Sequence, residues 1–246
     1  MNNYQEDYSD IQPKMFEVDG RLKKAKKVIK ILQKHLGELS NKNLLDIGCS
    51  SGIMTDYYAD FFQEVDALDI DQKAIEYALS NTKNKNINFI LSPLEELQVE
   101  KRYDVMICSH IYEHVPDSSI LFERIYDLLK SGGVCYFAAG NRYQIYENHY
   151  NLYFLSYLPK KLANFYLKIT KKGNYYYENH LSLLKLNKIT KKFIKHDFTL
   201  EVIKYPKRYE ADDMLEQDSF KHKIIVLLSK IFYFFIPTYI WVLEKP

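Results

Sequence analysis

The chain has 246 residues and a formal net charge of +2, and 47% of it is hydrophobic, 27% charged and 15% aromatic. An apolar fraction of this size can offset the chain entropy lost on folding, which excludes a disordered protein. Eight glycines and seven prolines exclude collagen-like and low-complexity chains. Three scattered cysteines exclude a disulfide framework and a CxxC metal site, so we assign no metal ligands from the sequence.

The sequence shows no segment that would export the chain or anchor it in a membrane. The first residues are polar and acidic, unlike the apolar core of a secretion signal. The longest apolar run, over residues 224–236, is shorter than the roughly 20 residues that a membrane-spanning helix needs. We therefore expect a cytoplasmic protein, with peripheral contact to the inner face of a membrane left open.

Helices and strands are predicted to alternate up to residue 140. A helix is expected from Leu22 to Gly37, because apolar residues recur there at helical spacing and glycine is a common stop. Alternation of this kind is typical of a parallel sheet with helices on both faces. The predicted strands cover 43–48, 65–70, 87–91, 103–109 and 134–139, and the predicted helices cover 53–62, 72–80 and 120–129.

The alternation stops after Gly140. Residues 141–180 are rich in tyrosine and show no clear strand. Five tyrosines are spaced by three and four residues, which would place them on one helical face: Tyr143, Tyr146, Tyr150, Tyr153 and Tyr157. Such a stripe could cover a flat or sugar-like acceptor, but we favour a packing role for most of it. The remaining predicted elements are a basic helix over 187–196, a strand over 198–205, a helix over 224–236 and a strand over 238–243.

A glycine-rich turn follows the first predicted strand, in the segment LLDIGCSSG. Such a turn lets a ligand approach the backbone, and the helix that it opens offers free N–H groups. Asp46, two residues before the first glycine, would repel a pyrophosphate and suit a ligand with a cationic end. Asp69, at the end of the second strand, can accept the hydroxyls of a ribose. The two acids together fit S-adenosylmethionine.

These motifs resemble those of class I S-adenosylmethionine-dependent methyltransferases. LLDIGCSSG is similar to their first motif, ALDID to the acidic end of their second strand, and YDVMICSHIYEHVPD to their fourth-strand motif. LLKSGGVCYF resembles the turn before their fifth strand, and TYIWVLEKP their antiparallel seventh strand. The resemblance covers residues 25–140 well and 198–246 loosely. It implies a Rossmann-like α/β sheet of seven strands, six parallel and the last antiparallel, with helices on both faces.

The resemblance also implies a set of cofactor-binding positions. Ser50 replaces the middle glycine of the usual turn, and Pro93 stands where an acid often follows the third strand, so an adenine contact would come from the backbone of Leu94. The expected cofactor-binding residues are Asp46, Gly48, Cys49, Ser50, Gly52, Asp69, Ile70, Leu94, Glu95 and Ser109. Asp71, placed directly before a helix, is interpreted as its N-cap.

Two histidines follow the fourth strand, at the edge of the sheet where ligands bind. His114 or His110 is the candidate base that removes the acceptor proton, although either could instead brace the loop. The stretches GNRYQIYENHYNL and ENHLSLL resemble a branch whose members act in glycan or lipid-linked sugar pathways. The candidate substrate-binding residues are Asn141, Arg142, Tyr146, His149 and Tyr150.

Basic residues are segregated along the chain, with seven lysines and arginines and no acid over residues 21–35. Such faces could bind nucleic acid or anionic lipid, but solvated helix faces are the interpretation that we favour. Nucleic acid is therefore not an expected partner.

The sequence thus predicts one methyltransferase domain over 1–246, with an N-terminal helical extension over 1–40 and a helical substrate lid over 141–197. The expected reaction is methyl transfer to a small-molecule hydroxyl, first of all in a sugar or glycan precursor. Two alternatives stay open. One is a quinone- or lipid-precursor methyltransferase at a membrane surface, and the other is a non-catalytic scaffold that binds S-adenosylmethionine.

Overall fold

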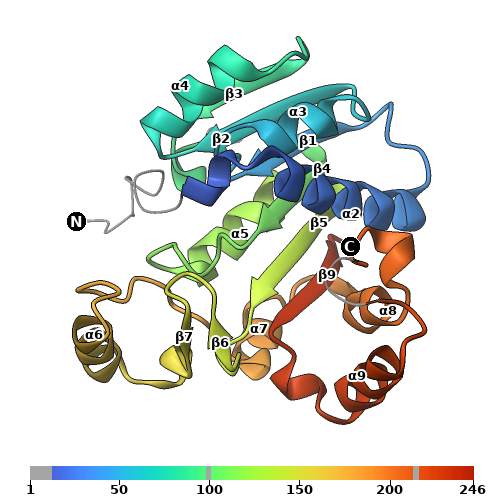
Figure 1. Ribbon diagram of the computed structural model, residues 1–246. Coiled ribbons are helices and arrows are strands. Elements are labelled where there is room, and N and C mark those ends of the chain that lie inside the picture. The colour runs from blue at the N-terminus through green and yellow to red at the C-terminus, as the bar shows by residue number, and fades with distance from the viewer. Residues whose placement is uncertain (1–12, 98–100, 213–215) are drawn as a thin grey trace.

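The computed structural model describes residues 13–97, 101–212 and 216–246, so the polar lead-in at the N-terminus lies outside the described residues. One large sheet runs through the molecule, and helices lie on both of its sides (Figure 1). The sheet has seven strands in the order β3-β2-β1-β4-β5-β9-β8. Its strands are β1 (Asn43–Ile47), β2 (Glu64–Asp69), β3 (Ile87–Leu91), β4 (Tyr103–Ser109), β5 (Leu129–Gly140), β8 (Ile194–Asp197) and β9 (Thr238–Glu244).

The strand directions confirm the predicted fold class. Strands β1 to β5 pair in parallel, and β9 runs antiparallel to β5 along its whole length, from Val134–Glu244 to Gly140–Thr238. Strand β8 pairs antiparallel with β9 and therefore has the direction of the first five. Six strands are thus parallel and the last in the chain is antiparallel. The carboxyl ends of β1 to β5 share one edge, called the carboxyl edge below.

Neighbouring residues of the central strands enter different cores because side chains alternate across a strand. Leu44 belongs to the core under the helices at the start of the chain, and Leu45 to the core on the opposite side. The first core is closed by α2 (Val18–Leu36) and α3 (Ile53–Ala59), and the second by α5 (Ser118–Leu128) and α7 (Leu183–Ile189). Helix α4 (Gln72–Asn81) covers β2 and β3.

Two predictions between residues 187 and 205 are wrong. The expected basic helix ends early, at Ile189, and β8 occupies residues 194–197; the expected strand 198–205 is instead α8 (Thr199–Lys204). Asp197 accounts for the start of the helix, because its side chain accepts a hydrogen bond from the N–H of Thr199 in the first turn. The apolar residues of α8 then divide between the two cores, Val202 entering one and Leu200 the other.

The segment between β5 and α7 is only partly helical. Strands β6 (Tyr146–Glu147) and β7 (Leu152–Tyr153) form a separate two-stranded sheet, followed by η3 (Leu155–Tyr157) and α6 (Lys160–Ile169). Tyr146 and Tyr153 are direct partners across this small sheet, with ring centroids 5.0 Å apart. The tyrosine stripe is therefore not a helical face, and the prediction that rested on helical spacing is wrong.

The remaining helical elements lie in the C-terminal part of the chain, near its N-terminus and after β3. Helix α9 (Phe220–Ile231) and η5 (Tyr233–Phe235) precede β9, and η4 (Pro206–Tyr209) follows α8. Near the N-terminus, η1 (Pro13–Phe16) lies against the glycine turn, since Ser51 Oγ donates to the Met15 carbonyl at 2.7 Å. The short η2 (Leu94–Glu96) follows β3.

Candidate active site

The glycine turn after β1 is tightly bound to β2. The N–H groups of Gly48 and Cys49 both donate to the carbonyl of Leu68, at 2.8 and 3.0 Å. Gly48 has φ +73°, and a Cβ there would lie 2.2 Å from Cδ1 of Ile111, the residue that follows His110 after β4. Only glycine therefore lets the two loops of the carboxyl edge approach each other this closely.

Asp69 is the acid that best fits a bound ribose. It ends β2 half-buried, and its two oxygens accept hydrogen bonds from the N–H groups of Ser50 (2.7 Å) and Asp71 (3.0 Å). Each carboxylate oxygen has a second lone pair, so both can still accept a ligand hydroxyl. Burial raises the pKa of Asp69, although the two amides oppose the shift.

The buried Ser50 Oγ has no hydrogen-bond partner among the described residues, which leaves a polar atom beside Asp69 for a ligand to satisfy. The turn therefore fits a nucleoside-containing cofactor. Asp71 accepts a hydrogen bond from the Ala74 N–H, which agrees with its interpretation as the N-cap of α4.

Asp46 lies deeper than the rest of the turn. It is 5% exposed, and its Oδ2 accepts a 2.7 Å hydrogen bond from the Thr55 hydroxyl of α3. Burial raises the pKa of Asp46 to about 6. A role toward the amino end of the cofactor, which stays a prediction, would therefore act through the backbone or a water. Leu94 and Cys49 are also buried, while Ile70, Glu95 and Ser109 are half-buried.

His110 stands at the end of β4 and pairs with the carboxylate behind it. Its Nδ1 lies 3.2 Å from Oε1 of Glu113, and the His110 side chain is 45% exposed while that of Glu113 is fully buried. Burial opposes ionisation of Glu113, but the hydrogen bond and charge of His110 outweigh it and lower the pKa of Glu113 to about 2. His110 also has φ +58°, a strained conformation that often marks functional positions.

His114 faces a second group of polar side chains, which the segment 141–197 supplies. Its ring lies 5.3 Å from that of His149, nearly perpendicular to it. Glu147 accepts from both neighbouring histidines, with Oε1 2.7 Å from Nδ1 of His149 and Oε2 2.8 Å from Nε2 of His180. Burial would lower the pKa of His149, but the hydrogen bond to Glu147 and the surrounding carboxylates raise it to about 9. For His114, burial dominates and lowers the pKa to about 4.

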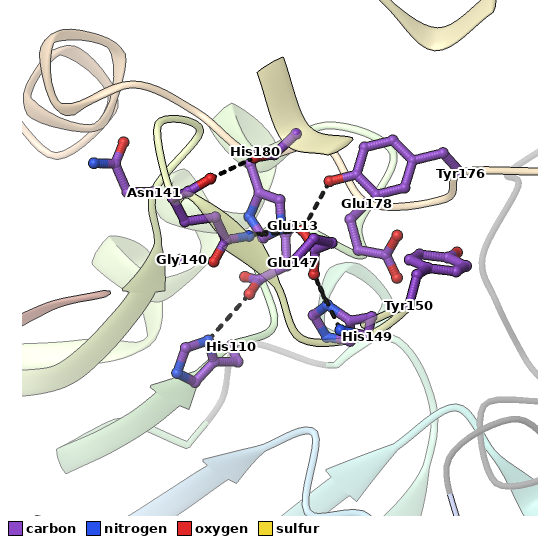
Figure 2. Close-up of polar contacts among 12 residues, drawn as sticks. His110, Glu113, Gly140, Asn141, Glu147, His149, Tyr150, Tyr176, Glu178 and His180 are labelled. Atoms are coloured by element: carbon purple, nitrogen blue, oxygen red, sulfur yellow. Dashed lines mark hydrogen bonds and ion pairs between the residues drawn. The ribbon is translucent and has the colours of Figure 1, made fainter. Parts of the chain in front are cut away.

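Further buried polar groups complete this network (Figure 2). Tyr176 donates to Oε2 of Glu147 at 2.9 Å, and Gln144 also contacts that oxygen at 2.6 Å. Glu178 is 3% exposed, and burial raises its pKa. The network is joined to the His110 pair through the backbone, since the N–H of Asn179 donates to the carbonyl of Glu113.

The candidate substrate residues behave differently from one another. His149 lies inside the network described above. Arg142 follows β5 and is half-exposed. Tyr150 is half-buried, and its hydroxyl donates to the Tyr175 carbonyl. Both stay predictions.

Two further substrate candidates lie outside this network, and their role stays a prediction. Asn141 is fully buried and holds the C-terminal segment through Nδ2, which donates to the carbonyls of Phe234 and Ile236 and to the Tyr239 hydroxyl. Tyr146 is exposed on the side of β6 opposite to Glu147, because adjacent strand residues point to opposite faces. Neither side chain is placed to contact a substrate in the network.

Sequence reasoning missed Glu147 and Glu178 and left His180 out of the candidate set. A signal was present, because the tripeptide Glu-Asn-His occurs twice, at residues 147–149 and 178–180. Both copies meet at one place in the fold: Glu147 contacts the histidine of each.

Comparisons with known proteins agree with the geometry. Residues 45–137 match the family described as a methyltransferase domain. The ubiquinone biosynthesis O-methyltransferase of Acinetobacter baylyi is 31% identical over 116 residues, which cover 45% of this chain and 49% of that protein. The protein of the same name from Rickettsia canadensis is 30% identical over 157 residues, covering 61% of this chain and 65% of that protein. The chain spans about half the length of several curated relatives that it matches.

Solved structures share the fold over nearly the whole chain. The N-methyltransferase NodS of Bradyrhizobium japonicum, in complex with S-adenosyl-L-homocysteine, has a TM-score of 0.59, 11% identity and coverage of 98% of this chain and 100% of that one. The plantazolicin methyltransferase BpumL has a TM-score of 0.60 at 16% identity, over 98% and 91% of the two chains. At these identities the likeness is one of fold alone. The motifs, the matching domain over residues 45–137 and the strand order agree, and each is similar to those of class I S-adenosylmethionine-dependent methyltransferases.

Proposed function

We propose that this protein transfers a methyl group from S-adenosylmethionine to a hydroxyl oxygen of a small quinone or lipid precursor, at the surface of a membrane. The observation that carries the proposal is the His110–Glu113 pair, which stands at the same sheet edge as Asp69 and the glycine turn. An exposed imidazole beside a cofactor site is suited to take the proton of an attacking hydroxyl.

The cofactor, when bound, supplies an electrophilic methyl group. Asp69 holds its ribose hydroxyls, and the backbone of Gly48 and Ser50 lines the methionine part. Glu113, ionised because its pKa is about 2, accepts the Nδ1–H of His110 and so directs Nε2 toward the acceptor. His110 is the better base of the two predicted histidines, because the His114 ring is held in the buried network.

The acceptor class is inferred from the relatives. The curated proteins that this chain resembles are named ubiquinone biosynthesis O-methyltransferases, which supports a quinone-type hydroxyl more than the sugar hydroxyl expected from the lid sequence. Phenolic and sugar hydroxyls differ in acidity, so the two classes are separable by assay. An amphiphilic acceptor would also explain a protein surface that is unusually apolar at one edge.

The helices with this apolar surface are α9 and α6, which lie at the lower right and the lower left of the molecule in Figure 1. His222 is the one fully buried residue of α9, and the helix also packs against α8. Its outward side chains are large and apolar, and Lys221, Lys223 and Lys230 lie among them. Four apolar residues of the helix and two that follow it are 45–80% exposed: Phe220, Leu227, Leu228, Ile231, Phe232 and Phe235.

Helix α6 repeats the pattern with Leu162, Phe165 and Ile169, which are 54–62% exposed at spacings of three and four. Lysines flank this stripe at residues 160, 161, 168, 171 and 172. Apolar side chains bordered by lysine are typical of helices that lie in the interface of an anionic bilayer. No helix in the described ranges of the chain has the length and apolarity to cross a bilayer.

The activity is tested with purified full-length protein and S-adenosylmethionine, by measuring S-adenosyl-L-homocysteine formed on matched panels of catechol, prenylated phenol and sugar acceptors. We expect turnover with phenolic lipids, loss of turnover by about 100-fold in His110→Ala, and a much smaller change in its cofactor affinity. Asp69→Ala should instead weaken cofactor binding measured by calorimetry. Turnover on sugars alone would show that the acceptor is a sugar and not a quinone or lipid precursor. Copurified S-adenosyl-L-homocysteine without any turnover would favour the scaffold alternative.

Membrane contact is tested separately by co-sedimentation with vesicles. The wild type should bind vesicles that contain anionic lipid and lose binding in the variant Leu227→Glu/Ile231→Glu. Leu79→Glu is the matched control, because Leu79 is also apolar and 62% exposed but lies on α4. Equal binding by the α9 variant and the control would refute this part of the proposal.

A further inference from the structure

We propose that His114, His149 and Glu178 form a binding site for one divalent transition-metal ion. Each of the three offers one ligand atom, and these atoms lie within 4.8 Å of one another. They come from three separate segments, the loop after β4 and the two Glu-Asn-His tripeptides, and the fold brings them together beside Glu113. A small movement of the three ligand atoms toward a common centre would bring each to bonding distance from a metal ion there, about 2.0–2.2 Å for imidazole nitrogen or carboxylate oxygen.

Glu147 prepares His149 for this role. Its Oε1 holds Nδ1 of His149 at 2.7 Å, so the opposite nitrogen, Nε2, is the one directed to a metal. A carboxylate behind a histidine is the usual arrangement around protein-bound metals, where it fixes the ring and makes it a better ligand. Glu147 is itself held by Tyr176 and Gln144, so the support is rigid.

Glu178 supplies an independent indication that a cation is bound. Its side chain is 3% exposed, and Oε2 has no hydrogen-bond partner among the described residues. A carboxylate oxygen buried in this way is costly, and a bound cation would satisfy it. Lys160 also lies near Glu178, but its Nζ donates to backbone carbonyls, that of Glu178 among them, so Oε2 keeps no partner among the described residues.

The donor set favours a transition metal over magnesium or calcium. Two imidazole nitrogens and one carboxylate oxygen suit Zn²⁺, Fe²⁺ or Co²⁺, whereas the hard cations prefer oxygen ligands throughout.

An ion at this position leaves coordination sites open for water or an acceptor oxygen. A metal-bound hydroxyl is far more acidic than a free one, which would lower the demand on His110. This consequence rests on the proposed function, whereas the metal site itself does not.

The test is a titration of chelator-treated full-length protein with Co²⁺, followed by its visible absorption, and with Zn²⁺ by calorimetry; bound metal is counted after gel filtration. We expect one ion per chain. His149→Ala and the isosteric Glu178→Gln should each lower affinity by at least 10-fold, and Glu147→Gln by about 10-fold or more through the displaced ring. Metal bound without methyl transfer would overturn only the proposed function.

The chain also contains a matched control. His35, His196 and Glu244 form another group with ligand atoms within 4.8 Å, between α2 and β8. His196→Ala should leave the Co²⁺ spectrum and stoichiometry unchanged. Absence of stoichiometric binding, or binding lost in His196→Ala and retained in Glu178→Gln, would overturn the assignment. Circular dichroism of each variant shows whether it has folded. If His149→Ala has not folded, the test rests on the isosteric variant Glu178→Gln.

Discussion

Replacing Gly52 by alanine should destabilise the protein more than the same change at Gly132. Both glycines have positive φ, +73° at Gly52 and +72° at Gly132, so alanine is strained at each. The surroundings differ. A Cβ at Gly52 would lie 2.7 Å from Cβ of Ala78 on α4 and 3.2 Å from the Phe89 ring, while nothing lies within 4 Å at Gly132.

The expected costs follow from these distances. Left-handed backbone costs an alanine about 1–2 kcal/mol, and no packing cost adds to it at Gly132. Overpacking in a closed core adds about 1–3 kcal/mol at Gly52, because Ala78 belongs to a helix that cannot move without disturbing β2 and β3. In a protein of this size each kcal/mol corresponds to roughly 2–4 °C in Tm.

Urea and thermal unfolding of the two variants measure the difference directly. Gly52→Ala should unfold several degrees below Gly132→Ala. It should also bind S-adenosylmethionine more weakly, since moving α4 displaces Asp71 and with it the amide that holds Asp69. Equal losses of stability in the two variants would refute the packing argument and leave only the backbone strain.

Three further predictions concern the lid and its neighbours. Asn141→Ala should cost about 1–3 kcal/mol in urea unfolding, because it removes the donor of the buried Ile236 carbonyl, whereas the Phe234 carbonyl keeps its bond from the Tyr239 hydroxyl. The raised pKa of His149 means that its protonated form favours the fold, so up to about 3 kcal/mol of stability should be fully present below pH 6.5 and be lost as the pH rises through about 9. A His149→Gln variant with the same pH profile as the wild type would contradict this. Gly140→Ala should lower turnover without changing cofactor affinity, because a Cβ there would lie 2.8 Å from Cε1 of His180; weaker cofactor binding instead would show a wider disturbance.

The parallel part of the sheet could be predicted because its signals are local. Each strand of the first 140 residues is a short apolar run that ends in a turn, and each following helix shows apolar residues at helical spacing. Asp69 and the glycine turn could be assigned for the same reason, since their geometry depends on the end of one strand and the start of one helix. The structure brings them together at the carboxyl edge.

The lid could not be predicted because its structure depends on distant partners. Tyrosine spacings of three and four fit a helix, but Tyr146 and Tyr153 lie in a hairpin that is anchored by Glu147. Glu147 owes its burial to Tyr176 and His180, which are 29 and 33 residues further along the chain. Nothing local in the sequence indicates such pairings.

The error at α8 has a different cause. Residues 198–205 are apolar enough for a strand, and the competing hydrogen bond from the Thr199 N–H to Asp197 is a single side-chain interaction. Asp197 is the last residue of β8, so the short strand and the helix depend on each other. A pattern of apolar residues alone cannot separate a short helix from a short strand.

The position of β9 has a consequence for how the molecule assembles. β9 follows every other strand in the sequence, yet it lies between β5 and β8 and pairs with both. During synthesis, β8 would therefore leave the ribosome well before the strand that joins it to the rest, and β5 would have an open edge for as long. Completion of the sheet must wait for residues 238–244, so we expect it to be a late event that follows release of this segment rather than one that keeps pace with translation.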